Sequence, residues 1–290
     1  MKVLITGAKG LVGAEIVHTF KDSYHEVIAK DHKALDITYS EGLRAGLEDI
    51  GPEWVINCAA YTKVDACEEN QDIAFKVNGK APGVIASICQ SLGIKLCHIS
   101  TDYVFDGTKE DTYTEDDITH PINIYGMSKL AGEKAIQENT DGYLIIRTQW
   151  LFGPAGPNFV SNILDMARQN KEIKVVNDQR GRPTYTRDLA KAIALLIEMD
   201  ARGIYHICNR GSASWYKLAK KAAEYAEVAT EIIPVGTDAF PRPAKRPMNG
   251  VLSTEKFRMY TKKTLAPWQL ALKEYIQGHL RGKVLACQDI

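Results

Sequence analysis

The feature that most limits the fold of this chain is a cluster of three glycines near its start. Gly7, Gly10 and Gly13 follow the apolar run of residues 3–5 and precede a helical pattern. A tight turn between strand and helix, with bare backbone and free N–H groups, is typical of a dinucleotide pyrophosphate site. The spacing is Gly-x-x-Gly-x-x-Gly, not the commoner Gly-x-Gly-x-x-Gly. The turn therefore indicates such a site only through its strand-to-helix context.

Apolar runs and helical patterns alternate beyond this turn. Because the runs are apolar throughout, they predict strands of a parallel sheet that is covered on both faces. The fold class is therefore α/β, a doubly wound (Rossmann) sheet followed by a smaller, less regular substrate domain. The predicted strands are residues 26–30, 54–58, 95–99 and 143–146, and the predicted helices between them include 72–92 and 128–138.

The same pattern predicts the domain organisation. Residues 1–150 form the dinucleotide-binding domain, and residues 151–290 form mainly the substrate domain. A helix at 187–198 and a strand at 203–208 are expected to fold back onto the first domain, so that 187–208 belongs to it. Residues 237–250 contain three prolines and should lack regular elements.

The composition limits the classes of partner that the protein is expected to bind. The 290 residues include 36 basic and 36 acidic side chains, so nothing in the charge favours nucleic acid or an anionic membrane. No apolar stretch has the length of a signal peptide or a membrane span, which predicts a cytoplasmic protein. The cysteines lack a Cys-x-x-Cys pair and are expected to be buried thiols: Cys58, Cys67, Cys89, Cys97, Cys208 and Cys287.

Polar residues stand at the ends of several predicted strands, where ligands bind in an open parallel sheet. Thr101 follows one of them, and Tyr125 and Lys129 open the helix after it. Their spacing places the phenol and the ammonium on one helix face. A nearby cation lowers the pKa of a phenol from its ordinary value of about 10. The pattern therefore predicts a proton donor, Tyr125, that is tuned by Lys129.

The spacing alone is weak evidence, because Tyr216 and Lys220 share it. The order of the motifs favours Tyr125: glycine turn, polar strand end, then the Tyr-Lys pair. Plainer interpretations stay open for single residues. Thr101 has the position of a turn cap, Trp150 is of a type common in cores, and residues 115–117 read as a solvated acidic loop.

Seven blocks in this order resemble the extended short-chain dehydrogenase/reductases, nearly from end to end. Several ordered blocks are more specific than any single motif. The blocks are residues 35–38, 57–65, 100–107, 125–129, 147–153, 178–184 and 246–247.

Within that family, the likeness is to reductases that act on the 4-keto group of a dTDP-linked sugar, 4-dehydro-L-rhamnose, in the synthesis of cell-surface polysaccharide. The resemblance implies hydride transfer from a reduced nicotinamide. Tyr125 would protonate the oxygen that becomes the 4-hydroxyl, Lys129 would lower the pKa of Tyr125 and hold the nicotinamide ribose, and Thr101 would hydrogen-bond the carbonyl.

The resemblance also implies binding residues. Five residues of the glycine turn would hold the phosphates: Gly7, Lys9, Gly10, Leu11 and Val12. Five more would lie along the cofactor, beside Tyr125 and Lys129: Asp36 and Ile37 at the adenine, then Ala59, Ala60 and Tyr61. The sugar nucleotide would meet Thr101, Asp102, Tyr103, Trp150 and the cation Arg246.

The sequence says less about which nicotinamide cofactor is bound and about the oligomeric state. Asp31, just past the second strand, would hold a ribose 2′-hydroxyl and disfavour a 2′-phosphate, whereas Lys9, Lys30 and Lys33 would do the reverse. We expect NADP(H), with NAD(H) as the alternative. The resemblance is compatible with a homodimer and with Mg²⁺, but nothing in the sequence has metal-ligand spacing, so no metal ligand is assigned.

Three other interpretations compete with the reductase. A nucleotide-sugar epimerase or dehydratase of the same superfamily would use the same Tyr-Lys pair. A non-catalytic regulatory subunit, like the β subunit of methionine adenosyltransferase, would bind dinucleotide only. A structural α/β protein would leave the polar strand ends unexplained.

Overall fold

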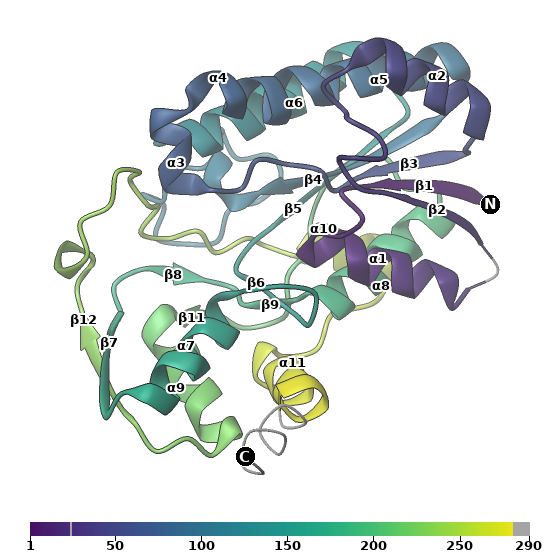
Figure 1. Ribbon diagram of the computed structural model, residues 1–290. Coiled ribbons are helices and arrows are strands. Elements are labelled where there is room, and N and C mark those ends of the chain that lie inside the picture. The colour runs from purple at the N-terminus through teal and green to yellow at the C-terminus, as the bar shows by residue number, and fades with distance from the viewer. Residues whose placement is uncertain (24, 281–290) are drawn as a thin grey trace.

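A six-stranded parallel sheet forms the centre of the computed structural model, which describes residues 1–23 and 25–280 (Figure 1). The strand order is β10-β5-β4-β3-β1-β2, and every neighbouring pair is parallel. The chain leaves β1 for β2 on one side and returns for β3 on the other, so a crevice opens between β1 and β3. The strands are β1 (Lys2–Thr6), β2 (Glu26–Lys30), β3 (Trp54–Asn57), β4 (Lys95–Thr101), β5 (Tyr143–Thr148) and β10 (Gly203–His206).

Helices cover both faces of this sheet (Figure 1). Successive side chains of a strand point to opposite faces. Val3 and Ile5 of β1 therefore join the core beneath α1 (Leu11–Lys21) and α8 (Thr186–Glu198), whereas Leu4 joins the opposite core. That second core lies under α2 (Ser40–Ile50), α5 (Ala81–Leu92) and α6 (Ile124–Asn139). The predicted doubly wound fold is confirmed.

The predicted helix at 72–92 is interrupted by a π-helical segment. It consists of α4 (Gln71–Ala74), the π-helix η1 (Phe75–Lys80) and α5, with α3 (Val64–Glu69) before it. A π-helix widens the turn by one residue and is frequent at functional sites. Here it places Asn78 against α6, where its amide contacts Ser128.

Residues after β5 build a second group of elements around their own core, drawn below the sheet in Figure 1. Phe152, Tyr185 and Tyr275 lie in that core. Three short two-stranded sheets and three helices surround it: β6 (Leu151–Phe152) with β9 (Thr184–Tyr185), β7 (Glu172–Val176) with β12 (Glu231–Val235), β8 (Arg180–Gly181) with β11 (Ala213–Ser214), then α7 (Phe159–Gln169), α9 (Trp215–Ala226) and α11 (Trp268–Tyr275).

Two elements later in the chain belong to the large sheet and to the helices that cover it. β10 pairs with β5 at the edge of the large sheet, and α8 packs against α1. Residues 237–250 contain one short 3-10 helix, η3 (Thr237–Ala239), and α10 (Glu255–Thr261) follows them. None of the helices in the described ranges is both long enough and apolar enough to cross a membrane.

Two expectations about side chains can be compared with the structure. The five cysteines that the structure describes are free thiols, four buried and Cys58 partly so, whereas Cys287 lies outside the described residues. The acidic loop is less solvated than expected. Glu115 is half-buried and accepts a hydrogen bond of 2.8 Å from the backbone of His206, because the loop lies along the edge strand β10.

Candidate active site

The glycine turn connects β1 to α1 at the carboxyl edge of the sheet. Gly7 has a φ of +62°, and a Cβ there would lie 2.6 Å from the backbone nitrogen of Ala59, so no other residue fits this turn unchanged. Gly10 precedes the first turn of α1, which has no side-chain cap and no acidic residue. The free N–H groups of Leu11 and Val12 and the dipole end suit an anion. These residues therefore fit a dinucleotide pyrophosphate.

Lys9 and Asp31 meet at this edge. The Lys9 ammonium forms an ion pair with the Asp31 carboxylate and is itself largely exposed. The hydrogen bond from Lys9, followed by that from the backbone of Ala34, lowers the pKa of Asp31 to about 2. Lys9 and Asp31, which the sequence predicted to favour different cofactors, thus pair with each other.

The other predicted cofactor residues line the crevice unevenly. Asp36 accepts hydrogen bonds from the backbone and hydroxyl of Thr38, and these lower its pKa. Ile37 is buried in the core under α2. A ligand would therefore contact its backbone and not its side chain. The strand end with Ala59, Ala60 and Tyr61 lies beside Gly7. The adenine and ribose contacts stay predictions.

Tyr125 and Thr101 meet at the next strand end. The Tyr125 side chain lies next to Thr101, which acts to lower the pKa of the phenol, and its ring lies edge-on to that of Tyr103 at 5.6 Å. Thr101 also accepts the backbone N–H of Tyr103 at 3.2 Å, so it caps the turn as the plainer interpretation required. Burial, and then the charge of Asp102, raises the pKa of Tyr125 above its ordinary value.

The lowered pKa that was expected for Tyr125 is therefore not found. Lys129 turns away from the phenol into the sheet, where its Nζ donates to the carbonyl of Ile99 at 2.6 Å and lies 3.1 Å from Nε2 of His98. The spacing of four residues placed both side chains on one face of α6, but a long lysine side chain reaches the most favourable buried acceptor.

Asp102 is buried behind Thr101. Thr101 donates to its Oδ1 at 3.1 Å, and a Cβ on Gly250 would lie 2.5 Å from its Oδ2. Burial raises the pKa of Asp102 to about 7. A carboxyl group that changes charge near neutral pH beside Tyr125 is typical of an active site.

A cavity of about 990 Å³ opens beside Tyr103 and is lined by residues of η3, α7, α9 and β7. Its wall is partly apolar, through Phe159, Trp215 and Phe240, and it carries four cations: Lys174, Arg242, Lys245 and Arg246. Among the predicted substrate residues, Tyr103 and Arg246 line this cavity. It has the size and mixed lining of a site for a small molecule with an anionic group.

Arg246 and Trp150 both have protein partners. Arg246 donates to Asp65 at 2.6 Å and the pair lowers the pKa of that carboxyl, so the cation is held at the cavity by α3. Trp150 has a φ of +48°, rare for a bulky residue, and stacks on Trp215 at 3.6 Å. Since Trp215 lines the cavity, Trp150 contributes to its wall from behind.

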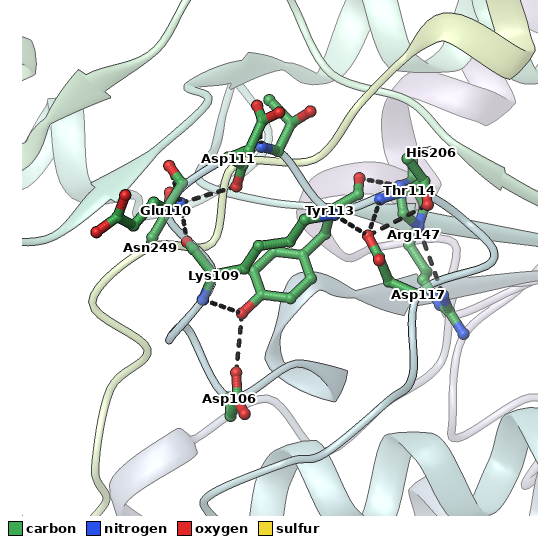
Figure 2. A network of polar contacts seen from close by, with 11 residues as sticks. Asp106, Lys109, Glu110, Asp111, Tyr113, Thr114, Asp117, Arg147, His206 and Asn249 are labelled. Atoms are coloured by element: carbon green, nitrogen blue, oxygen red, sulfur yellow. Dashed lines mark hydrogen bonds and ion pairs between the residues drawn. The ribbon is translucent and has the colours of Figure 1, made fainter.

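Polar contacts fix the loops beneath this site (Figure 2). Asn249 donates to the backbone carbonyl groups of Lys109 at 2.6 Å and Asp111 at 3.0 Å, which ties the segment after Arg246 to the loop after Tyr103. The same loop continues to Tyr113, whose carbonyl faces Nδ1 of His206 at 3.2 Å. His206 in turn contacts Arg147, as Figure 2 shows.

Arg147 also forms a buried ion pair. Its guanidinium makes three hydrogen bonds to Glu133 of α6, the shortest 2.7 Å, and both side chains are almost fully buried. Ser100 donates to the same carboxylate. Because Ser100 and Arg147 are register partners on β4 and β5, the pair locks α6 against the strand end that carries Thr101.

Sequence reasoning missed three buried polar residues at this edge. Asn78 holds the backbone of Tyr61 with two hydrogen bonds of 2.8 and 2.9 Å, and Asn57 and His98 lie behind Lys129. Asn57 and His98 carried a signal in the sequence, a polar side chain at the end of or within an apolar run, whereas Asn78 lies between lysines and carried none. No cluster of three or more His, Cys, Asp or Glu side chains able to hold a metal occurs within residues 1–23 and 25–280.

The parallel sheet, the glycine turn and the Thr101–Tyr125 pair together define an extended short-chain dehydrogenase/reductase. The chain belongs to the family described as RmlD substrate binding domain, whose model matches residues 1–280.

Relatives agree with this assignment. The spore coat polysaccharide biosynthesis protein SpsK of Bacillus subtilis is 40% identical over 278 residues, or 95% of this chain and 97% of the relative. A dTDP-4-dehydrorhamnose reductase of Burkholderia thailandensis is 39% identical over 94% of this chain and 97% of its own length. The solved dTDP-4-dehydrorhamnose reductase of Bacillus anthracis in complex with NADP is 38% identical, with a TM-score of 0.93 over 96% of this chain and 99% of that one.

Proposed function

We propose that this protein reduces the 4-keto group of dTDP-4-dehydro-L-rhamnose to give dTDP-L-rhamnose, with NADPH as reductant. The observation that carries the proposal is the placement of Tyr125 and Thr101. They contact each other at the carboxyl edge of the sheet, between a glycine turn that suits a pyrophosphate and a cavity lined by cations. The names of the relatives support the same reaction.

When bound, a reduced nicotinamide supplies the hydride. Tyr125 donates the proton to the carbonyl oxygen, because its raised pKa keeps it protonated at neutral pH. Thr101 lies next to Tyr125 and is the proposed ligand of the same oxygen as charge develops. Lys129 is the proposed ligand of the nicotinamide ribose, reached by turning from its present contact with Ile99.

The substrate nucleotide fits the cavity beside Tyr103. A diphosphate needs cations, and Arg246 with its neighbours Arg242 and Lys245 provides them on one loop. A planar base needs apolar or aromatic surface, which Trp215 and Phe240 offer across the cavity. These roles rest on the chemistry of the lining.

NADPH is favoured over NADH because Lys9 neutralises Asp31 at the end of β2, and this weakens the repulsion of a 2′-phosphate. Reduced cofactor of this kind is made in the cytoplasm, where we place the reaction. A homodimer remains an expectation that sedimentation velocity tests directly.

A coupled set of assays tests the function. Purified protein is mixed with dTDP-4-dehydro-L-rhamnose and either NADPH or NADH, with and without EDTA, and the absorbance of the reduced nicotinamide is followed. We expect faster consumption with NADPH, and the EDTA arm tests the Mg²⁺ that the resemblance implies. Tight dinucleotide binding without turnover would instead support a regulatory subunit, and epimerised sugar without net oxidation would support an epimerase.

A further inference from the structure

A chain of buried polar side chains crosses the sheet behind Lys129. Thr6 of β1, Asn57 of β3 and His98 of β4 are consecutive register partners, and Lys129 of α6 completes the row. Each of the four is 1% exposed. Buried polar groups in such a row must match donors with acceptors, so each proton can be assigned in turn.

The amide of Asn57 has one allowed orientation. The backbone N–H of Ala59 points at its Oδ1 from 3.2 Å, and a backbone N–H can only donate. Thr6 donates its hydroxyl to the same oxygen at 2.6 Å. The amide NH₂ therefore faces Nδ1 of His98, at 3.0 Å, and needs a lone pair there.

The tautomer of His98 follows. Burial, and then the nearby Lys129, lowers the pKa of His98 well below its ordinary value, so the ring is neutral and carries one proton. Since Nδ1 accepts from Asn57, that proton is on Nε2. Nε2 lies 3.1 Å from Nζ of Lys129. An ammonium has no lone pair and cannot accept this proton. A charged Lys129 would therefore face the Nε2–H of His98 with an N–H of its own, two donors with no acceptor between them.

Among the described residues, the titratable groups that face Lys129 offset this conflict only in part. The facing groups are the thiol of Cys58 from β3, His98 from β4 and the carboxylate of Glu133 from α6. Glu133 is already engaged by Arg147 and Ser100. Burial lowers the pKa of Lys129 to about 8, against the opposing effect of Glu133.

We propose that Asn57 and His98 are positioning residues that present a hydrogen-bond donor to Lys129 and thereby favour its neutral amine over its ammonium form in the ligand-free protein. The neutral amine accepts from Nε2–H of His98 and donates to Ile99. The ammonium forms by uptake of one proton from water, and the charged side chain then leaves His98. The inference concerns the resting state of Lys129 and does not depend on the identity of the sugar.

The tautomer can be measured without any substitution. In ligand-free protein labelled with ¹⁵N-histidine, the ring nitrogen shifts distinguish a protonated Nε2 from a protonated Nδ1, and His98→Gln identifies the signals by their loss. We expect His98 to carry its proton on Nε2 from pH 6 to 9. A proton on Nδ1 would overturn the proposal.

The charge of Lys129 gives a second, independent readout. The ¹³Cε and ¹⁵Nζ signals of labelled lysine report each titration, and Lys129→Met assigns the relevant one. We expect Lys129 to titrate well below the other lysines. In His98→Gln, the amide oxygen takes the place of Nε2 as an acceptor, so the apparent pKa should rise by at least one unit, a tenfold gain in proton affinity.

His206→Gln is the matched control, because His206 is also a buried neutral histidine but contacts Arg147 instead. It should leave the titration of Lys129 unchanged. Titration of Lys129 together with the surface lysines in the unmodified protein, or an unshifted titration in folded His98→Gln, would contradict the proposal.

Discussion

Tyr125 enters the proposed reaction as a protonated phenol, because burial and the charge of Asp102 both disfavour its anion. At neutral pH the phenol is therefore protonated, the state in which it can donate a proton to the carbonyl oxygen. The charge beside Tyr125 depends on pH, since burial raises the pKa of Asp102 to about 7.

Tyr125→Phe is the sharpest test at the residue scale. The change keeps the ring and its contact with Tyr103 but removes the proton donor. We expect kcat for keto-sugar reduction to fall by roughly two to four orders of magnitude, with dinucleotide affinity nearly unchanged. Steady-state kinetics and a fluorescence titration of NADPH measure the two effects.

The matched control is Tyr216→Phe, in a second Tyr-x-x-x-Lys spacing on α9. There the Lys220 ammonium lies 5.9 Å from the centre of the Tyr216 ring, far along the chain from the glycine turn. Its kinetics should equal those of the unmodified protein. Full activity in Tyr125→Phe would refute the proposed acid.

Arg246→Ala tests the cavity. Loss of a charged hydrogen bond to the substrate diphosphate, worth about 1.5–3 kcal/mol, should raise KM for the sugar nucleotide by roughly tenfold to a hundredfold and leave kcat close to normal. Arg258→Ala is the control, because that arginine pairs with Glu255 on the exposed helix α10. An unchanged KM in Arg246→Ala would place the diphosphate elsewhere.

At the scale of elements, helix α6 is the part that assembles the site. It carries Tyr125 and Lys129, and Glu133 joins it to β5 through Arg147. Glycines allow it to approach its neighbours. A Cβ at Gly126 would lie 2.1 Å from the carbonyl oxygen of Tyr103. The backbone of α6 therefore packs directly on the backbone of Tyr103.

Gly132→Ala should displace this helix. The added Cβ would lie 2.1 Å from the carbonyl oxygen of Asn78 in the π-helix, and backbone cannot move aside like a side chain. We expect a loss of about 1–3 kcal/mol in the free energy of unfolding, as in overpacked cores, together with a lower kcat. Urea titrations and steady-state kinetics measure both.

Gly46→Ala on α2 serves as the comparison, since its Cβ would meet only Cδ1 of the Leu35 side chain, at 3.2 Å. Alanine favours a helix over glycine by about 1 kcal/mol, so this variant should be as stable as the parent or more so. Equal stability of the two variants would mean that α6 has room to move.

At the scale of the whole molecule, segments far apart in the sequence share one buried network. His206 on the edge strand contacts Arg147 of β5 and the carbonyl of Tyr113 (Figure 2). Burial, and then Arg147, lowers the pKa of His206 to about 3. The fold therefore holds this histidine neutral, whereas the unfolded chain protonates it below about pH 6.5.

That difference predicts how stability changes with pH. Between pH 6.5 and 3 the unfolded chain binds a proton at His206 that the folded protein does not, so this contribution to stability is lost as the pH falls. From pH 7 to 5 it amounts to about 2 kcal/mol. In His206→Gln, the decrease in the free energy of unfolding over that range should be smaller by this amount.

Urea titrations at pH 7 and pH 5 make the measurement, in a range where carboxylates of the unfolded chain stay ionised. His18→Gln is the control, because His18 is exposed and pairs with Asp22 at 3.6 Å. The same pH dependence in His206→Gln and in the parent would show that His206 is not held neutral.

Local patterns in the sequence determined the strands, the doubly wound sheet and the edge at which ligands bind. Apolar runs, glycine turns and helix periodicity are properties of neighbouring residues, and parallel strands bring their ends to one edge wherever they pair. The predicted strand 26–30 coincides with β2, and the positions of Thr101 and Tyr125 at the carboxyl edge follow from the same rules.

Only the tertiary structure decided the directions of side chains and the charges they carry. Lys129 shares a helix face with Tyr125, yet its partners are His98 and Ile99, which are distant in the sequence. Burial, the largest influence on the pKa of Tyr125, comes from strands and loops packed around it. Periodicity specifies a face, but desolvation and hydrogen bonding depend on what the rest of the chain places against that face.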